Sequence, residues 1–218
     1  MKKKIGEMKI SITRPYFDKE EERVVIGVLR SGWVSQGPKV AEFEAMFAKY
    51  TGAKYAVATS SATTALFLSL HTLGVGQGDD VIVPSFSFIA TANVIVHTGA
   101  RPVFVDIDPR TYNIDPGKIE KKITKETKAI LPVDQVGLPC DIDEIKTIAK
   151  KHKLFIVQDA ACATGSKYNG KRIGSFCDTT CFSFHPRKIV TTGDGGMITT
   201  NSKSIADRTR LLRHQGMG

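Results

Sequence analysis

Short apolar runs that alternate with helical segments limit most strongly how this chain can fold. The runs are YAVAT, DVIVP, RPVFV, KAILPV and LFIVQ, and between them lie helix-like stretches such as SATTALFLSLHTLG and DIDEIKTIAKKH. Continuous apolar runs of this length are typical of parallel strands that are buried on both faces. The sequence therefore predicts an α/β fold in which helices flank a mostly parallel central sheet.

The two ends of the chain follow a different pattern. Near the start, Asp18 precedes a helical stretch that ends at Gly32, and a second stretch runs from Pro38 to Gly52. Asp before a helix, Pro in its first turn and Gly after its last turn are typical boundary residues. Near the end, TTCFSF and MITT flank the Gly-rich TTGDGG, which predicts neighbouring strands, and a last helix follows at SIADRTRLLRH.

Composition and charge exclude several classes of protein. Hydrophobic residues make up 41% and charged residues 24% of the 218 residues, which excludes a low-complexity disordered chain. No run of about 18 apolar residues occurs, so we expect no membrane span. The net charge is +9, but no aromatic-interleaved basic motif accompanies it, so we expect no nucleic-acid partner. We interpret Lys2–Lys4 as part of a frayed terminus and the lysines between residues 118 and 128 as a solvated face.

The cysteines indicate neither a metal site nor a secreted protein. Cys140, Cys162, Cys177 and Cys181 lack the paired CxxC spacing of a zinc site. The first ten residues, MKKKIGEMKI, are basic but lack the apolar segment of a signal peptide. We therefore expect reduced thiols, no metal and a cytoplasmic location.

In open α/β sheets, ligands bind outside the carboxyl ends of the strands. The residues that follow the apolar runs are therefore candidate ligand-binding residues. After YAVAT comes Ser60–Thr64, where a strand turns into a helix. Exposed amides and hydroxyls at a helix start bind anions, although a plain N-cap explains the same residues. The segment has no Walker A lysine and no GxGxxG, which disfavours ATP and dinucleotides.

Asp159 directly follows LFIVQ, and Lys188 lies between TTCFSF and TTGDGG. Taken singly, Asp159 fits an N-cap or a structural ion pair, Lys188 an exposed lysine, and Phe88 a core position. Taken together, an anion cradle, a strand-end carboxylate and a lysine are the groups that hold pyridoxal phosphate. They contact its phosphate, ring nitrogen and aldehyde. A desolvated lysine loses its proton and becomes a nucleophile, and Phe88 could stack on the ring.

At these residues the chain resembles the DegT/StrS family of pyridoxal-phosphate-dependent sugar aminotransferases, a branch of the aspartate-aminotransferase-like (fold type I) enzymes. The resemblance is carried by RPYFDKEEERVV, SGWVSQGPKVAEFE, TSSATTAL, VPSFSFIATAN, DAACATGS, FSFHPRKIVTTGDGGMITT and RLLRHQGM. It extends from about Ile10 to the last residue, and its most specific part surrounds Lys188. It implies the large domain of that fold type.

The resemblance implies a role for each candidate residue. Lys188 forms the internal Schiff base with pyridoxal phosphate and moves the proton between the substrate carbon and C4′ of the cofactor. Asp159 pairs with the pyridine nitrogen, and Phe88 stacks on the ring. The other cofactor contacts that it implies are Ala62, Thr63, Cys162 and Ser183. Gly32, Trp33 and Val34 belong to a loop near the substrate, where Trp33 either lines the pocket or anchors the loop.

Four residues depart from the family pattern. Ala62 stands where the family usually has Gly, Cys162 where it has His or Gln, Asp134 where it has His, and Asp194 where it has Glu. Ala62 implies a looser backbone approach to the phosphate, and Cys162 removes a polar neighbour of the ring. A branch of the family that dehydrates its substrate has His in place of the lysine, so Lys188 argues against that branch.

The resemblance also implies a domain organisation. Residues 1–36 supply an N-terminal helix and an active-site loop, and residues 37–218 form the large cofactor-binding domain. The resemblance also leads us to expect that the smaller C-terminal domain of the family is absent from this sequence. In the family the site is completed across a dimer interface, so the expected partners are a second copy, a keto sugar and an amino-acid donor.

The sequence therefore predicts an aminotransferase that moves an amino group from an amino acid, such as glutamate, to a nucleotide-linked keto sugar. The reaction is expected to be ping-pong and to run through Lys188. Two alternatives stay open. One is a non-catalytic or regulatory protein that keeps the cofactor fold, and the other is a fragment that works only with a separate C-terminal piece.

Overall fold

A computed structural model describes residue 11 and residues 13–217 of the chain. The expectations for Lys2–Lys4, and the two ends of the family resemblance at Ile10 and Gly218, lie outside the described residues. Among the helices of the described part, none is both long enough and apolar enough to cross a membrane.

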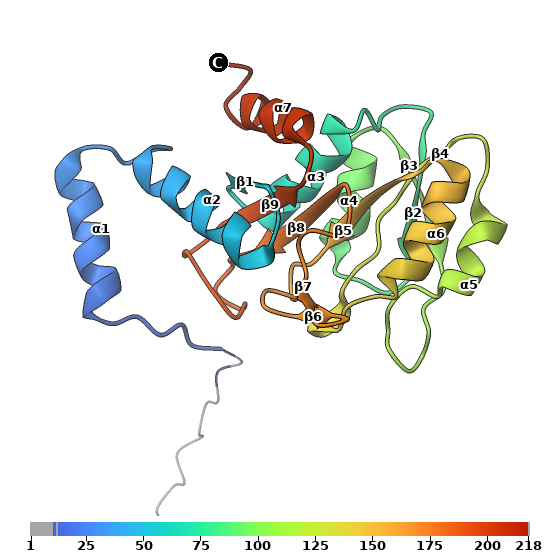
Figure 1. The fold of residues 1–218 in the computed structure, drawn as a ribbon, viewed down its shortest axis with the longest axis horizontal. Coiled ribbons are helices and arrows are strands. Elements are labelled where there is room, and N and C mark those ends of the chain that lie inside the picture. Colours follow the sequence, from blue (N-terminus) through green and yellow to red (C-terminus); the bar gives the residue numbers. More distant parts are fainter. Residues whose placement is uncertain (1–10, 12, 218) are drawn as a thin grey trace, which may run out of the picture.

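A seven-stranded sheet forms the centre of the molecule, with the strand order β1-β9-β8-β5-β4-β2-β3 (Figure 1). Its strands are β1 (Tyr55–Thr59), β2 (Asp80–Pro84), β3 (Arg101–Val105), β4 (Thr127–Ile130), β5 (Phe155–Asp159), β8 (Thr179–Ser183) and β9 (Gly196–Thr200). β9 is antiparallel to both of its neighbours, and the remaining strands all run in one direction. The mostly parallel sheet expected from the apolar runs is confirmed, as is the adjacent β8–β9 pair.

Helices cover both faces of this sheet. The helices of the described residues are α1 (Lys19–Ser31), α2 (Pro38–Thr51), α3 (Ala62–Thr72), α4 (Ile89–His97), α5 (Pro116–Ile119), α6 (Ile142–His152) and α7 (Lys203–Arg213), with 3-10 turns at Glu120–Lys122 and Gln135–Gly137. Apolar clusters place α3, α4 and α7 on one face, and α2, α5 and α6 on the other. Phe182 and Phe184 of the β8 segment pack in the α2 cluster, so both are buried on the face opposite Ser183.

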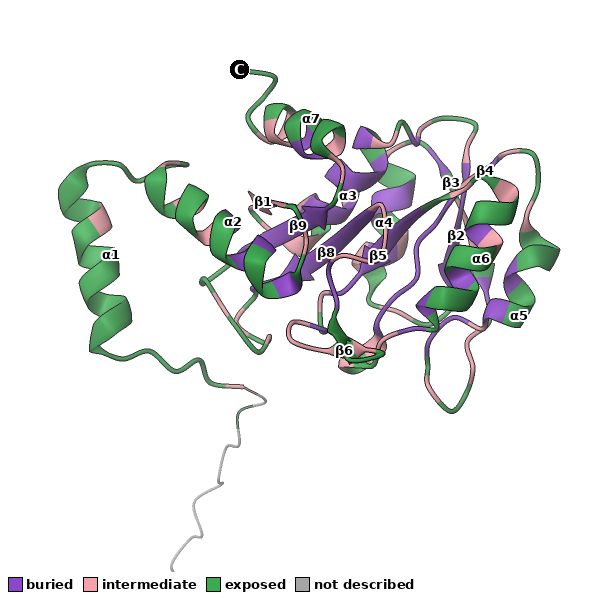
Figure 2. Cartoon of the chain, in the orientation of Figure 1, coloured by how far each residue is buried: buried purple, intermediate pink, exposed green. Residues whose placement is uncertain are grey.

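Local chemistry explains the ends of the first two helices. The Asp18 side chain accepts a hydrogen bond from Glu20 N–H, and a capping box with Glu21 completes the start of α1. Gly32 and Gly52 end α1 and α2 in the left-handed conformation, with φ of 72° and 75°. No residue of α1 is buried, and the helix stands apart from the body of the molecule (Figure 2).

A small hairpin was not expected from the sequence. β6 (Lys167–Tyr168) pairs with β7 (Lys171–Arg172) in a separate antiparallel sheet. Asn169 and Gly170 turn the chain between them with φ of 48° and 77°. Asn-Gly is the preferred pair for such a two-residue turn, so the signal was present in the sequence.

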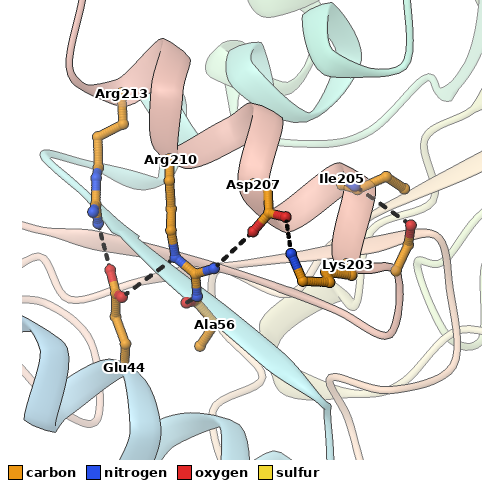
Figure 3. Close-up of polar contacts among 8 residues, drawn as sticks. Glu44, Ala56, Lys203, Ile205, Asp207, Arg210 and Arg213 are labelled. Atoms are coloured by element: carbon orange, nitrogen blue, oxygen red, sulfur yellow. Dashed lines mark hydrogen bonds and ion pairs between the residues drawn. The ribbon is translucent and has the colours of Figure 1, made fainter. Parts of the chain in front are cut away.

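Side chains from two helices bind the outer margin of the sheet at β1. Figure 3 shows Glu44 of α2 facing Arg210 and Arg213 of α7. Arg213 pairs with Glu44 and also donates to Ala58 O at 2.9 Å, while Ala58 N–H donates to Glu44 Oε1 at 2.8 Å. Arg210 donates to Ala56 O at 3.2 Å. This group of Glu44, Arg210 and Arg213, the β1 clasp, therefore joins α2, α7 and the outer strand.

Replacing Glu44 with Ala is expected to lower the free energy of unfolding by about 3 kcal/mol. The side chains of Glu44 and Arg213 are only 11% and 14% exposed, so the variant leaves a buried guanidinium without its carboxylate partner and the Ala58 N–H without its acceptor. Urea unfolding measures the change. Glu42→Ala is the matched control on the same helix, because Glu42 pairs with Lys39 in solvent and is expected to contribute about 0.5 kcal/mol or less. Equal losses in the two variants would contradict a structural role for the clasp.

Candidate active site

The strand register brings the predicted site residues to one edge of the sheet. Gly196, the first residue of β9, lies opposite Thr59 of β1 on one side and Ser183 of β8 on the other. Asp159 at the end of β5 lies opposite Cys181 of β8. The carboxyl ends of β1, β5 and β8 therefore meet at the edge where β9 begins.

The start of α3 can accept an anion. Ser61 is the N-cap, and its Oγ accepts a hydrogen bond from Thr64 N–H at 3.1 Å, so the N-cap interpretation is confirmed. Ala62 and Thr63 occupy the first turn, where N–H groups have no carbonyl within the helix to bind. The N-cap and an anion at these amides are compatible, because they use different N–H groups.

Gly196 packs directly against this helix start. A Cβ atom added to it would lie 2.4 Å from the carbonyl carbon and oxygen of Ser61 and 2.7 Å from Ala62 N. Only a residue without a side chain allows β9 to approach so closely. The sequence marked this stretch as a Gly-rich turn without identifying the contact, which needs the fold to be known.

Asp159 is a buried carboxylate with two donors. Its Oδ1 accepts from Ala161 N–H at 3.1 Å and its Oδ2 from the Thr91 hydroxyl at 2.9 Å. Burial raises the pKa of Asp159 above its usual value, while the two hydrogen bonds and the positive charge of Lys188 act to lower it. The group thus lies within electrostatic reach of Lys188.

Lys188 lies in the loop between β8 and β9, which is fixed at its base. Phe184 N–H donates to Gly195 O at 2.9 Å, and Thr192 N–H donates to Phe184 O at 3.1 Å. The Lys188 side chain is half-buried, and its Nζ donates to Cys162 Sγ at 3.1 Å. The amine therefore faces the segment that follows Asp159.

Two further predicted cofactor residues lie on neighbouring elements. Ser183 is 5% exposed at the end of β8, and its Oγ accepts from His185 N–H at 3.3 Å. Phe88 is the N-cap of α4 with 76% of its surface exposed, so it is not a core residue. Its carbonyl accepts from Thr91 N–H at 3.0 Å, which links it to the residue that binds Asp159.

The three predicted substrate residues lie at the end of α1 and in the loop that follows it. Gly32 ends α1, and Trp33 and Val34 are exposed in the following loop. The Trp33 indole donates to Gln36 O at 2.7 Å, as an anchor of the loop would. Within the described residues, no hydrogen bond joins Gly32–Val34 to Asp159 or to the Lys188 loop.

Asp134, one of the departures from the family pattern, lies beside the site in a buried network. Its carboxylate accepts from Cys140 N–H at 3.0 Å and from Gln158 Nε2 at 2.9 and 3.1 Å. Its own N–H donates to Asp159 O at 2.9 Å. Burial raises the pKa of Asp134 from 3.8 to about 6 against the opposing effect of these donors.

The raised pKa of Asp134 predicts a specific dependence of stability on pH. A carboxyl group with a higher pKa in the folded state stabilises the fold when protonated, and that contribution is lost as the pH rises from about 4 through 6. In urea unfolding at a series of pH values, wild type should lose roughly 3 kcal/mol relative to Asp134→Asn over this range. A difference between the two proteins that stays constant with pH would contradict the raised pKa.

These groups fit pyridoxal phosphate. The site has an amine at Lys188, a buried carboxylate at Asp159, and a helix start whose anion cradle requires Gly196 to lack a side chain. No group of three or more His, Cys, Asp or Glu side chains in the described residues is arranged to hold a metal ion. An open hollow of about 720 Å³ between α6 and the start of α7 contains none of the predicted site residues.

Comparison with known proteins identifies the family. Residues 15–218 match the DegT/DnrJ/EryC1/StrS aminotransferase family. The chain is 49% identical over 210 residues to GDP-perosamine synthase of Caulobacter vibrioides, covering 96% of this chain and 57% of that protein. It is 50% identical over 203 residues to spore coat polysaccharide biosynthesis protein SpsC of Bacillus subtilis, covering 93% and 52%.

A solved structure agrees with the match. The PLP form of the putative sugar aminotransferase Spr1654 from Streptococcus pneumoniae superposes with a TM-score of 0.89 at 37% identity, covering 93% of this chain and 57% of that one. The chain thus spans about half the length of the curated relatives that it matches. With this fold and these matches, the chain belongs to the DegT/DnrJ/EryC1/StrS aminotransferase family.

Proposed function

We propose that this chain is the cofactor-binding part of a pyridoxal-phosphate-dependent sugar aminotransferase. The observation that carries the proposal is the meeting of Lys188, Asp159 and the start of α3 at one edge of the sheet. The names of the relatives support a sugar substrate, and the PLP form of Spr1654 supports the cofactor.

Pyridoxal phosphate, when bound, supplies an aldehyde that condenses with amines and a ring that stabilises negative charge on the attached carbon. In the proposed site, Lys188 Nζ is the amine that would hold the aldehyde. It would then move the proton between the substrate carbon and C4′ of the cofactor. Asp159 holds the proton on the ring nitrogen, and Phe88 covers a ring face. The amides of Ala62 and Thr63 and the Ser183 hydroxyl bind the phosphate, and Cys162 contacts the ring beside Lys188.

The proposed substrates are a keto sugar and an amino-acid donor. GDP-perosamine synthase is named for a nucleotide-linked amino sugar, which supports a nucleotide-linked keto sugar here. We propose glutamate as donor and a ping-pong order, in which the donor leaves its amino group before the sugar enters.

The exposed first helix supports a second copy of the chain as partner. Val24, Val25, Ile26 and Leu29 of α1 are each more than 40% exposed, and Trp33 and Val34 follow them. Because no hydrogen bond joins Gly32–Val34 to the Lys188 loop within the described residues, we propose that they contact substrate in the site of the partner. The described part of residues 1–36 then supplies the N-terminal helix and the active-site loop, and residues 37–218 are the proposed cofactor-binding domain.

Spectroscopy of the purified chain with pyridoxal phosphate tests the proposal. Attachment to a lysine is expected to give a yellow protein, and borohydride should fix the cofactor on the peptide that contains Lys188. L-glutamate should bleach the colour and yield 2-oxoglutarate. Mass spectrometry and absorbance measure both outcomes.

The same experiment separates the alternatives. A yellow protein that does not respond to glutamate would favour a non-catalytic cofactor-binding protein. A response that appears only after addition of the C-terminal half of a relative would favour a fragment. A protein that stays colourless, or that is labelled on another lysine, would overturn the proposed function.

A further inference from the structure

A chain of two hydroxyl groups leads to the buried carboxylate of Asp159. Thr91 Oγ1 donates to Asp159 Oδ2 at 2.9 Å, and Ser87 Oγ lies 2.7 Å from Thr91 Oγ1. Thr91 is only 1% exposed, whereas Ser87 is half-buried. Nothing in the local sequence around Thr91 points to Asp159, because the two residues are 68 positions apart.

The direction of these hydrogen bonds follows from counting protons. An ionised carboxylate only accepts, so the single hydroxyl proton of Thr91 goes to Asp159. The proton between Ser87 and Thr91 must then come from Ser87. Both hydroxyl dipoles therefore point toward the carboxylate, where they favour its charged form.

The same segment carries the aromatic residue of the proposed site. Phe88 lies between Ser87 and the start of α4, and its carbonyl accepts the Thr91 N–H. Thr91 thus holds Asp159 through its hydroxyl and Phe88 through its backbone. A shift of Thr91 would move the partner of the ring nitrogen and the residue on the ring face together.

We propose that Thr91 is the positioning residue of the cofactor site, fixing the Asp159 carboxylate with the help of Ser87, an inference that rests on the proposed function. The hydroxyl restrains the rotation of the carboxylate and leaves its other lone pairs free for the ring nitrogen. Ala161 N–H holds the second oxygen, and Lys188 is the cation that acts on the same group. Removal of the Thr91 hydroxyl leaves Asp159 buried with one donor fewer.

Titration of the cofactor-free protein tests this directly. Carbon-13 NMR follows the Asp159 carboxyl signal, assigned by its loss in Asp159→Asn. In Thr91→Val the titration midpoint should rise by about one to two pH units, because a hydrogen bond to a charged group is removed. Thr91→Ser should restore it. Thr98→Val is the control at the C-cap of the same helix, since the Thr98 hydroxyl donates only to Ile95 O, and it should leave the midpoint unchanged.

Ser87→Ala provides a second variant in case Thr91→Val does not fold. Ser87 is half-buried, and its removal should raise the Asp159 midpoint by a smaller amount than Thr91→Val. An unchanged midpoint in both Thr91→Val and Ser87→Ala would overturn the proposal. An equal rise in Thr98→Val would also overturn it, because the effect would then belong to the helix as a whole.

Cofactor affinity gives the second readout. The dissociation constant for pyridoxal phosphate should be about tenfold higher or more in Thr91→Val than in wild type, and Thr91→Ser should be close to wild type. Equal affinities of wild type and Thr91→Val for pyridoxal phosphate would overturn the role of Thr91 in cofactor binding. If wild type bound no pyridoxal phosphate, the proposed function would fail, and the NMR comparison would still decide whether Thr91 controls Asp159.

Discussion

Replacing Lys188 with Ala is expected to remove the yellow colour of the protein incubated with pyridoxal phosphate and to slow the glutamate half-reaction by about a thousand-fold or more. The variant loses the amine that holds the aldehyde and the group that moves the proton, while Asp159 and the start of α3 remain. Absorbance after borohydride treatment measures the attachment, and 2-oxoglutarate formation measures the rate.

Lys171→Ala is the matched control for this variant. Lys171 is an exposed residue of the β6–β7 hairpin, so its removal should leave colour and rate unchanged. If Lys188→Ala kept a borohydride-fixed cofactor, another amine would have to be the attachment point and the site would need to be reassigned.

Replacing Gly196 with Ala should lower the free energy of unfolding by about 3 kcal/mol and the melting temperature by roughly 6–12 °C. The new Cβ atom would meet backbone atoms of Ser61 and Ala62 at 2.4–2.7 Å, so β9 or the start of α3 has to move. Because Ala62 belongs to the proposed phosphate site, affinity for pyridoxal phosphate should fall as well. Calorimetry and cofactor titration measure the two effects.

Gly76→Ala tests whether any added methyl group would do the same. A Cβ atom at Gly76 would lie 3.7 Å from the nearest atom, Thr98 O, which is an ordinary contact. Its melting temperature should stay within about 2 °C of wild type. A similar loss in both variants would show that the close approach at Gly196 is not the cause.

The sheet could be predicted because its buried strands appear in the sequence as short runs of apolar residues. YAVAT and DVIVP coincide with β1 and β2, and LFIVQ overlaps β5. Continuous apolar residues are required where both faces of a strand are covered. The ends of α1 and α2 could also be predicted from nearby residues. Each end is determined by a residue beside it, namely Asp18, Gly32, Pro38 or Gly52.

What could not be predicted depends on contacts between distant segments. Thr91 looks like an ordinary helix residue until β5 places Asp159 beside it. Gly196 looks like part of a flexible turn until β9 pairs next to the start of α3. The roles proposed for Lys188 and Asp159 rest on the combination of strand ends and the family resemblance.

The β1 clasp has a consequence for how copies of this chain behave toward one another. Strands at the margins of a sheet present free backbone groups that can recruit strands from other molecules and start fibrils. At β1, Arg210, Arg213 and Glu44 already bind those groups. At the opposite margin, β3, Arg101 N–H points inward to Asp79 O. The backbone nitrogen of the next residue therefore faces outward. That residue is Pro102, which has no N–H to donate. Each margin therefore has a feature that disfavours amyloid-like strand addition, and the loss of Glu44 would free the Ala58 N–H at the first of them.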